Sequence, residues 1–169
     1  MDVEAAIRAR RTHKQYGSEP LSDDALRELT DLARFAPNHK LTQPWRFRVL
    51  GPAIRAEIER LAGEKEAVKL RRAPSLLLAT AVLSGDPLVD EEDLHATACA
   101  VYAILLGATA RGLASYWRTP KCFLQADVRA ALGLGDGERI VALIHLGPVL
   151  SEPAAKERAP LEAILQFVP

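Results

Sequence analysis

The chain has 169 residues, of which 49% are apolar and 26% are charged, and its formal net charge at pH 7 is zero. This length and composition are typical of a soluble globular protein, and we expect residues 1–169 to form a single domain with its own core. Zero net charge is unfavourable for a general nucleic-acid or anionic-membrane binder, because such proteins need a surplus of Lys and Arg.

Neither the N-terminus nor the cysteines indicate export. Residues 1–4 include two acidic side chains, and no apolar signal region follows them. No apolar run approaches the roughly 20 residues that a membrane span requires. Cys99 and Cys122 lack the spacing of a metal or redox site. We therefore expect a cytoplasmic protein with reduced thiols and no membrane association.

Two helices are predicted first, one from Asp2 to about Arg10 and one from the N-cap Ser22 to about Phe35. The first ends in a strongly basic segment, residues 8–14. One interpretation is a solvated helix end, because the helix dipole favours cations there. The other is an anion site, in which guanidinium groups and a hydroxyl converge on a phosphate. The residues of that site would be Arg10, Arg11 and Thr12.

The connection 36–47, APNHKLTQPWRF, leads into a strand that alternates in polarity from Trp45 to Leu50. Pro37 and Pro44 restrict the backbone, because each fixes its own φ and disfavours the helical region for the residue before it. Short connections of fixed shape often present side chains to a ligand, although an ordinary hydrophilic loop fits equally well. The polar side chains presented here are Asn38, His39, Lys40, Thr42 and Gln43.

Helices and strands alternate in the middle of the chain. A helix over Ala53–Ala62 stops at Gly63, and the charged segment 64–72 is expected to be a solvated connection. The apolar run 75–83 is typical of a strand covered on both faces. Residues 85–93 form a predicted acidic surface loop.

The longest predicted helix follows, from 93 to about 111, and its apolar character on most faces predicts the buried centre of the fold. A strand at 113–117, a helix at 126–132 and a strand at 139–146 come next. Only 160–167 of the remaining tail is periodic enough for a short helix. The tail is too apolar to lie free in water, so we expect it to pack on the body or on a second subunit. The element order predicts an α+β fold.

Several catalytic signatures are missing from the sequence. Gly133, Gly135 and Gly137 follow a helix and precede a strand, which is the reverse of a dinucleotide fingerprint. There is no phosphate loop and no nucleophile elbow. The four histidines show no metal-site spacing, and His145 in an apolar strand is interpreted as a core histidine. We therefore expect no metal and no nucleophile paired with its own base.

Three polar clusters remain, each at the end of a predicted element: Arg10–Thr12, Asn38–His39 with Gln43, and Trp117–Thr119. Guanidinium groups and hydroxyls suit a phosphate, and amide and imidazole groups suit the edge of a polar ring. Together they provide the chemistry needed to hold flavin mononucleotide (FMN).

These clusters resemble the nitroreductase family of FMN-dependent oxidoreductases, over nearly the whole chain. Residues 10–12 (RRT) resemble its arginine-rich signature, with threonine in place of the usual serine, and 36–45 (APNHKLTQPW) resembles its helix-to-strand motif. Residues 117–119 (WRT) resemble the Trp-Arg-Ser of the compact branch often called YdjA-like. Residues 146–148 and 158–162 resemble the closing pattern, and the segment 63–74 is shorter than in most relatives.

The resemblance implies a homodimer with a mixed or antiparallel sheet of four to five strands flanked by helices, and with FMN at the subunit interface. The implied FMN-binding residues are Arg10, Arg11, Thr12 and Arg118 for the phosphate and ribityl chain, His39 and Gln43 from the partner subunit, Trp117, which would help to position the segment beneath the flavin, and Thr119. NAD(P)H is implied, less specifically, at Gly107, Ala108, Thr109, Ala110, Arg111 and Gly112.

The implied reaction passes hydride from NAD(P)H to flavin N5 and then electrons to a nitroaromatic, quinone or similar small acceptor. The flavin supplies the chemistry, so no catalytic side chain is required. Two alternatives stay open. One is a flavin-binding protein without reductase turnover, acting as a sensor, carrier or flavin-modifying enzyme. The other is a cofactor-free interaction module whose arginines serve a protein or RNA partner.

Overall fold

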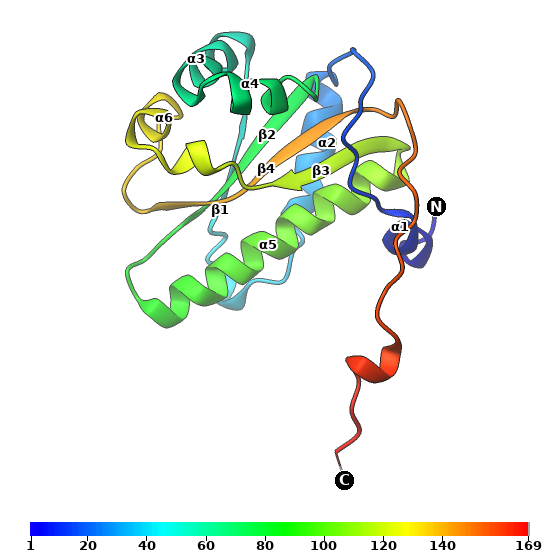
Figure 1. Ribbon diagram of the computed structural model, residues 1–169. Coiled ribbons are helices and arrows are strands. Elements are labelled where there is room, and N and C mark those ends of the chain that lie inside the picture. The colour runs from blue at the N-terminus through cyan, green and yellow to red at the C-terminus, as the bar shows by residue number, and fades with distance from the viewer. Residues whose placement is uncertain (169) are drawn as a thin grey trace.

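Four antiparallel strands form the centre of the computed structural model, which describes residues 1–168 (Figure 1). They are β1 (Trp45–Val49), β2 (Ser75–Val82), β3 (Leu113–Arg118) and β4 (Glu138–Pro148). Their order in the sheet is β1-β2-β4-β3, so β2 and β4 are central and β1 and β3 form the edges. The α+β fold with a four-stranded antiparallel sheet confirms the predicted fold class.

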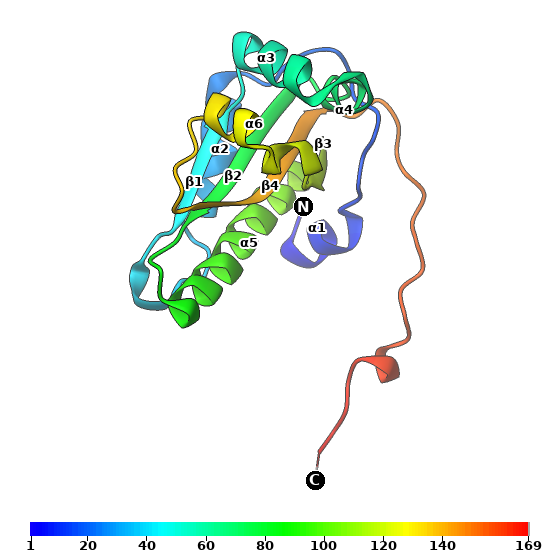
Figure 2. The same ribbon diagram turned by 60° about the vertical axis from the view of Figure 1, so that its left-hand side comes forward.

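Helices cover both faces of this sheet (Figures 1 and 2). The helices are α1 (Val3–Ala9), α2 (Asp23–Ala33), α3 (Pro52–Ala62), α4 (Glu64–Leu70), α5 (Pro87–Ala110) and α6 (Ala126–Ala131). One face packs against α2 and α5, and the other packs against α3, α4 and α6. The alternation of β4 shows why: Ala142 and Ile144 lie in the first core and Leu143 lies in the second.

The helix α5 begins earlier than the sequence predicts. Asp86 is its N-cap, accepting hydrogen bonds from the backbone N–H groups of Leu88 and Val89, and Pro87 occupies the first turn. The predicted loop 85–93 is therefore mostly helical, because a capped start needs no apolar periodicity. By length and composition α5 could cross a membrane, contrary to the expectation of no such run. Its packing against the sheet, α1 and α2 identifies it instead as a core helix.

The charged segment 64–72 is also a helix over most of its length, rather than the predicted solvated connection. In α4, Ala67 and Leu70 are buried against the second core. The charges lie outside and pair with each other, for example Lys69 with Glu66 at 2.6 Å. A single buried stripe is sufficient to fix a short helix, even when most of its residues are charged.

The C-terminal tail leaves the domain. Residues 154–168 are exposed, and their only regular element is the 3₁₀ turn Leu161–Ala163, which is shorter than the predicted helix. Figures 1 and 2 both show the tail running away from the body. The expectation that it packs on the body of its own chain is therefore wrong, and packing on a second subunit stays a prediction. Phe167 and Val168 are 89% and 84% exposed.

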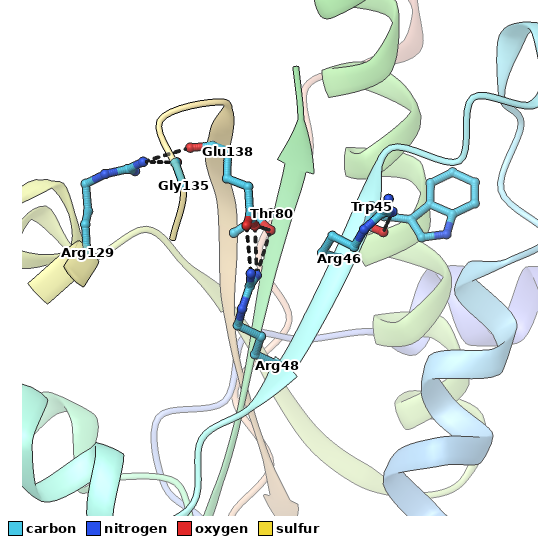
Figure 3. A network of polar contacts seen from close by, with 7 residues as sticks. All are labelled: Trp45, Arg46, Arg48, Thr80, Arg129, Gly135 and Glu138. Carbon is cyan, nitrogen blue, oxygen red and sulfur yellow. Dashed lines mark hydrogen bonds and ion pairs between the residues drawn. The ribbon is translucent and has the colours of Figure 1, made fainter. Parts of the chain in front are cut away.

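A polar network ties three strands together at the end of the sheet where β4 begins (Figure 3). Arg48 of β1 forms a bidentate pair with Glu138 of β4, at 2.7 and 2.8 Å, and Thr80 of β2 donates to the same carboxylate at 2.6 Å. A register shift between Ala79 and Thr80 accompanies this contact. The hydrogen bonds from Arg48 lower the pKa of Glu138, so the pair is ionised at neutral pH.

Candidate functional site

A cavity of about 630 Å³ lies between the segment that follows α1 and the segment that follows β4. Its walls come from the segment after α1, from Tyr116 on β3 and from the segment after β4. The lining residues are Arg10, Arg11, Thr12, Lys14, Gln15, Tyr116, Ser151, Pro153, Ala154, Lys156 and Arg158. The structure therefore brings together Arg10, Arg11 and Thr12, the first predicted cluster. The volume is in the range of small-molecule sites.

The N-terminal segment reaches this position because it is bound to the edge of the sheet. The backbone N–H of His13 donates to the carbonyl of Ser115 at 3.0 Å, and the N–H of Ser115 points to His13 Nδ1 at 3.3 Å. Tyr16 forms an isolated β-bridge with Val149. Residues 10–15 and 149–156 consequently run side by side, as Figures 1 and 2 both show.

The electrostatics of the cavity are one-sided. Five of its lining residues are cations: Arg10, Arg11, Lys14, Lys156 and Arg158. None of the five forms an ion pair with a carboxylate within residues 1–168. Arg11 donates only to backbone carbonyls, those of Arg8 and Arg10. Like charges gathered without a counter-ion repel each other, so this arrangement is suited to an anionic ligand.

The third predicted cluster lies outside the cavity. The side chain of Trp117 packs against the first core, and its Nε1 donates to the carbonyl of Val141 at 3.1 Å. Arg118 has a side chain only 12% exposed and forms a short ion pair with Glu66 of α4. Its Nη1 has no hydrogen-bond partner in the described chain. Thr119 is exposed, and the only residue of β3 that lines the cavity is Tyr116.

His39 and Gln43 also lie apart from the cavity within one chain. His39 Nδ1 is 2.8 Å from Glu92 Oε2, near the N-terminal end of α5. The helix α1, which leads into the cavity, packs beside the C-terminal half of α5. About 25 Å of helix separates Asp93 from Ala110, at a rise of about 1.5 Å per residue. The His39–Gln43 connection and the cavity with Arg10–Thr12 therefore lie near opposite ends of α5.

The predicted NAD(P)H segment has a structural role in helix packing. A Cβ atom at Gly107 would lie 2.3 Å from Leu32 Cδ1, so the glycine permits the close approach of α2 and α5. Ala108 is fully buried, and Arg111 donates to the carbonyl of Gly107 at 3.2 Å. The exposed residues of the segment are Ala110, Arg111 and Gly112. Only these three lie free for extensive contact with a ligand.

A second, apolar hollow of about 900 Å³ runs along α1, α2 and α5. Val3 and Phe35 in its wall are 71% and 78% exposed, which is unusual for large apolar side chains on a monomer. The side chains from α5 are mainly small. Its lining residues are Met1, Asp2, Val3, Ala6, Leu32, Phe35, Ala36, Pro37, Ala98, Cys99, Tyr102, Ala103, Leu106, Gly107, Ala110 and Arg111.

His145, which was interpreted as a core histidine, is 1% exposed and neither ring nitrogen has a hydrogen-bond partner in the described chain. Burial, with smaller contributions from the nearby Arg118, Arg55 and Arg72, lowers its pKa to about 3. The ring is therefore neutral at pH 7 and packs between Tyr16 and Tyr116.

Sequence analysis missed half of the basic cavity. Lys14 belongs to the basic helix end and stands where many family members carry an arginine, but neither pattern predicts that it lines this cavity, and no pattern singles out Tyr116. Lys156 and Arg158 lie in a segment without periodicity, and no local signal indicates what they face. Arg158 does belong to the closing pattern 158–162, so the resemblance offered the one available hint.

Comparisons with known proteins identify the family of this chain. A family profile described as "Nitroreductase family" matches residues 7–82 and 62–148. The Bacillus subtilis protein YfhC, named "Putative NAD(P)H nitroreductase", is 28% identical over 173 residues, which cover 92% of this chain and 88% of that protein. A Thermus thermophilus protein named "NADH dehydrogenase" is 27% identical, covering 98% of this chain and 95% of its own.

Solved structures resemble the fold closely. A nitroreductase-like family protein from Bacillus cereus superposes with a TM-score of 0.89 at 23% identity, over 99% of this chain and 96% of that chain. A Desulfovibrio desulfuricans protein, described as a "putative nitroreductase in complex with FMN", has a TM-score of 0.81 at 26% identity, over 98% of this chain and 96% of that chain.

Proposed function

The chain belongs to the nitroreductase family, and from this premise we propose that it is a homodimeric, FMN-dependent oxidoreductase that uses NAD(P)H. The observation that supports this most strongly is the cavity lined by five cations without carboxylate partners. Relatives named NAD(P)H nitroreductase and NADH dehydrogenase, and a similar structure solved with FMN, support the same cofactor and co-substrate.

The cavity fits the phosphate end of FMN. Guanidinium groups bind phosphate through paired N–H donors, and Arg10, Arg11 and Arg158 supply three of them. Thr12 and Ser151 add hydroxyls, which suit the remaining phosphate oxygens or the ribityl chain. When bound, FMN would accept hydride at N5 from NAD(P)H and transfer electrons to a small acceptor such as a nitroaromatic or a quinone.

We assign the phosphate to the cavity cations rather than mainly to Arg118. The guanidinium of Arg118 already binds Glu66 and is largely buried, so a phosphate would have to displace that carboxylate. The predicted contact of Arg118 with the cofactor therefore requires displacement of the Glu66 side chain. Contact between NAD(P)H and the end of α5 is proposed only for Ala110, Arg111 and Gly112, which are exposed.

A second subunit would complete the site. His39 and Gln43 lie near one end of α5, and the cavity lies near its other end. A twofold axis that packs the α5 helices of two chains antiparallel would bring each cavity close to the His39–Gln43 corner of the partner. The apolar hollow along α1, α2 and α5 provides the surface, and its small side chains allow close helix approach. The exposed apolar tail would add further contacts.

The proposal is tested on the purified native protein by absorbance spectroscopy. We expect a yellow protein whose flavin bleaches when NADH or NADPH is added without oxygen, and recovers its colour when a nitroaromatic or quinone follows. A flavin that stays oxidised under excess NADH and NADPH would indicate a flavin-binding protein without turnover. A colourless protein that FMN cannot reconstitute would contradict both functions.

The same protein tests the phosphate assignment. FMN and riboflavin differ only in the phosphate, so the ratio of their dissociation constants isolates its contribution. We expect FMN to bind at least about 100-fold more tightly, because two charge-assisted hydrogen bonds contribute about 1.5–3 kcal/mol each. Equal affinity for FMN and riboflavin would show that the cavity does not bind the phosphate.

A further inference from the structure

The connection between α2 and β1 has an unusual backbone. Lys40, Leu41 and Gln43 have positive φ angles of 54°, 52° and 47°, although none of them is glycine. This conformation costs on the order of 1–2 kcal/mol for each residue that has a side chain. Three such residues within one short segment need surrounding contacts that hold the backbone in place.

Part of that support lies inside the segment. Asn38 Oδ1 accepts a hydrogen bond from the backbone N–H of Gln43 at 2.6 Å, and Asn38 Nδ2 donates to Thr42 Oγ1 at 2.9 Å. These bonds close residues 38–43 into a compact turn. They do not fix its orientation relative to the rest of the domain, because both partners move with the turn.

The orientation is set by two contacts with α5. The hydroxyl of Thr42 donates to Asp93 Oδ1 at 2.5 Å, and His39 Nδ1 is 2.8 Å from Glu92 Oε2. Asp93 is 5% exposed, and a buried carboxylate is costly unless a donor satisfies it. The Thr42–Asp93 bond therefore gives the turn one preferred position and orientation against α5.

Held against α5 in this way, the turn presents its side chains to solvent. Residues 39–43 are all exposed, and Leu41 is 75% exposed, so the strain yields no buried apolar contact in return. A simple connection between a helix and a strand has no need of this conformation. Strained backbone that displays polar side chains is characteristic of ligand sites, where the geometry is fixed before the ligand arrives.

We propose that Asp93 is a positioning residue for the flavin site: through Thr42 it holds the 38–43 turn so that His39 and Gln43 face the flavin ring bound by the partner subunit. This inference rests on the proposed function. Glu92 assists, because a carboxylate that accepts from Nδ1–H leaves the Nε2 of His39 directed outward. Asp93 itself is too buried to touch the cofactor.

Two substitutions alter the bond, one by removing its donor and the other by weakening its acceptor. Thr42→Val removes the hydroxyl with little change in shape, and Asp93→Asn replaces the charged acceptor with a weaker neutral one. We expect Thr42→Val to raise the dissociation constants of both FMN and riboflavin by about tenfold, the value of roughly one hydrogen bond to a charged group, and Asp93→Asn to raise both by a smaller factor. The two ligands respond alike because the turn faces the ring, which they share.

Three further measurements separate positioning from general damage. Thr42→Ser keeps the hydroxyl and should restore wild-type affinity. Glu91→Gln is the matched control, because Glu91 is exposed on the same helix and should leave both affinities unchanged. The midpoint potential of the bound flavin should shift in Thr42→Val and Asp93→Asn, and stay at the wild-type value in Thr42→Ser and Glu91→Gln.

The outcomes are distinct. If the folded Thr42→Val and Asp93→Asn proteins bind FMN and riboflavin like the Glu91→Gln control, the positioning role is wrong while the flavin site stands. An effect on FMN alone would place the turn at the phosphate and also overturn the inference. If the wild-type protein binds neither flavin, the proposed function fails, and this inference fails with it.

Discussion

Two charged regions of this protein differ in whether their charges are paired within the fold. This difference distinguishes a region that stabilises the structure from one that binds a ligand. At one end of the sheet, Arg48 and Glu138 satisfy each other, with Thr80 as an additional donor (Figure 3). In the cavity between residues 10–15 and 151–158, five cations lie together and none has a carboxylate partner among the described residues. The first region has all its charges neutralised within the fold, whereas the second needs a charge from outside.

The comparison indicates how buried and clustered charges are to be interpreted. A paired charge stabilises the fold, and its removal leaves the partner unsatisfied. An unpaired cluster of one sign contributes nothing to the free energy of folding and opposes it slightly by repulsion. Substitutions in the two regions should therefore have opposite profiles, affecting stability in the first and ligand affinity in the second.

The largest expected effect is on stability. Glu138→Ala should lower the free energy of unfolding by about 3 kcal/mol, because it leaves Arg48 and Thr80 without their acceptor. Urea denaturation measures this loss, and FMN affinity should not change. Glu157→Ala in the exposed tail is the control and should be neutral. A loss below about 0.5 kcal/mol for Glu138→Ala would mean that the network is not a structural element.

Substitutions in the cavity should change ligand affinity and leave stability nearly unchanged. Arg10→Ala should raise the dissociation constant of FMN about 10- to 100-fold, corresponding to about 1.5–3 kcal/mol for a charged hydrogen bond. The stability of the protein without FMN should stay the same or rise slightly. Arg27→Ala, which removes an exposed ion pair with Asp24, is the matched control and should leave FMN affinity unchanged. Equal affinities in both variants would contradict the anion site.

Protonation of His145 provides a third comparison, because this unpaired group is buried and neutral. Its pKa is about 3 in the folded chain and near 6.5 when unfolded, so the unfolded state binds the proton first as pH falls. Stability should therefore be complete above pH 6.5 and decrease towards pH 3, losing about 1 kcal/mol between pH 7 and 5.5. Denaturation at both pH values should show a smaller decrease in His145→Gln.

The carboxylate Glu138 has the same sign as His145, since stability decreases as the pH falls, but it acts in a lower pH window. Its folded pKa is lowered, so its contribution is present above the unfolded pKa and is lost only as the pH falls through the folded value. The decrease in the free energy of unfolding between pH 7 and 5.5 should accordingly persist in Glu138→Gln. Loss of that decrease in Glu138→Gln would show that His145 is not its origin.

The smallest expected effect is that of salt. Raising ionic strength from about 0.05 to about 0.5 M should weaken FMN binding several-fold, because exposed cations are screened beyond the Debye length. Riboflavin, which has no phosphate, should respond little. Fluorescence titration of both ligands measures the difference. Parallel salt curves for FMN and riboflavin would indicate that the cavity does not hold the phosphate.

Much of the secondary structure is predictable because it depends on neighbours in the chain. Asp86 was overlooked as an N-cap, but Ser22 was recognised and accepts from the N–H of Ala25 as expected. The continuous apolar run of β2 is buried on both faces, as predicted. The differences at 64–72 and 85–93 share one cause: a run of charged residues favours a solvated loop by composition alone, whereas a helix needs only one buried face.

The family and the α+β class were determined by the sequence, through local patterns and the motifs at 10–12 and 36–45. Only the tertiary structure decided which charges are paired within the fold and which are available to a ligand. Arg118 pairs with Glu66, and Arg10 lines the same cavity as Arg158, from distant parts of the chain. The role of a charge depends on the charges and the solvent within a few ångströms of it, and those neighbours are set by the fold rather than by sequence separation.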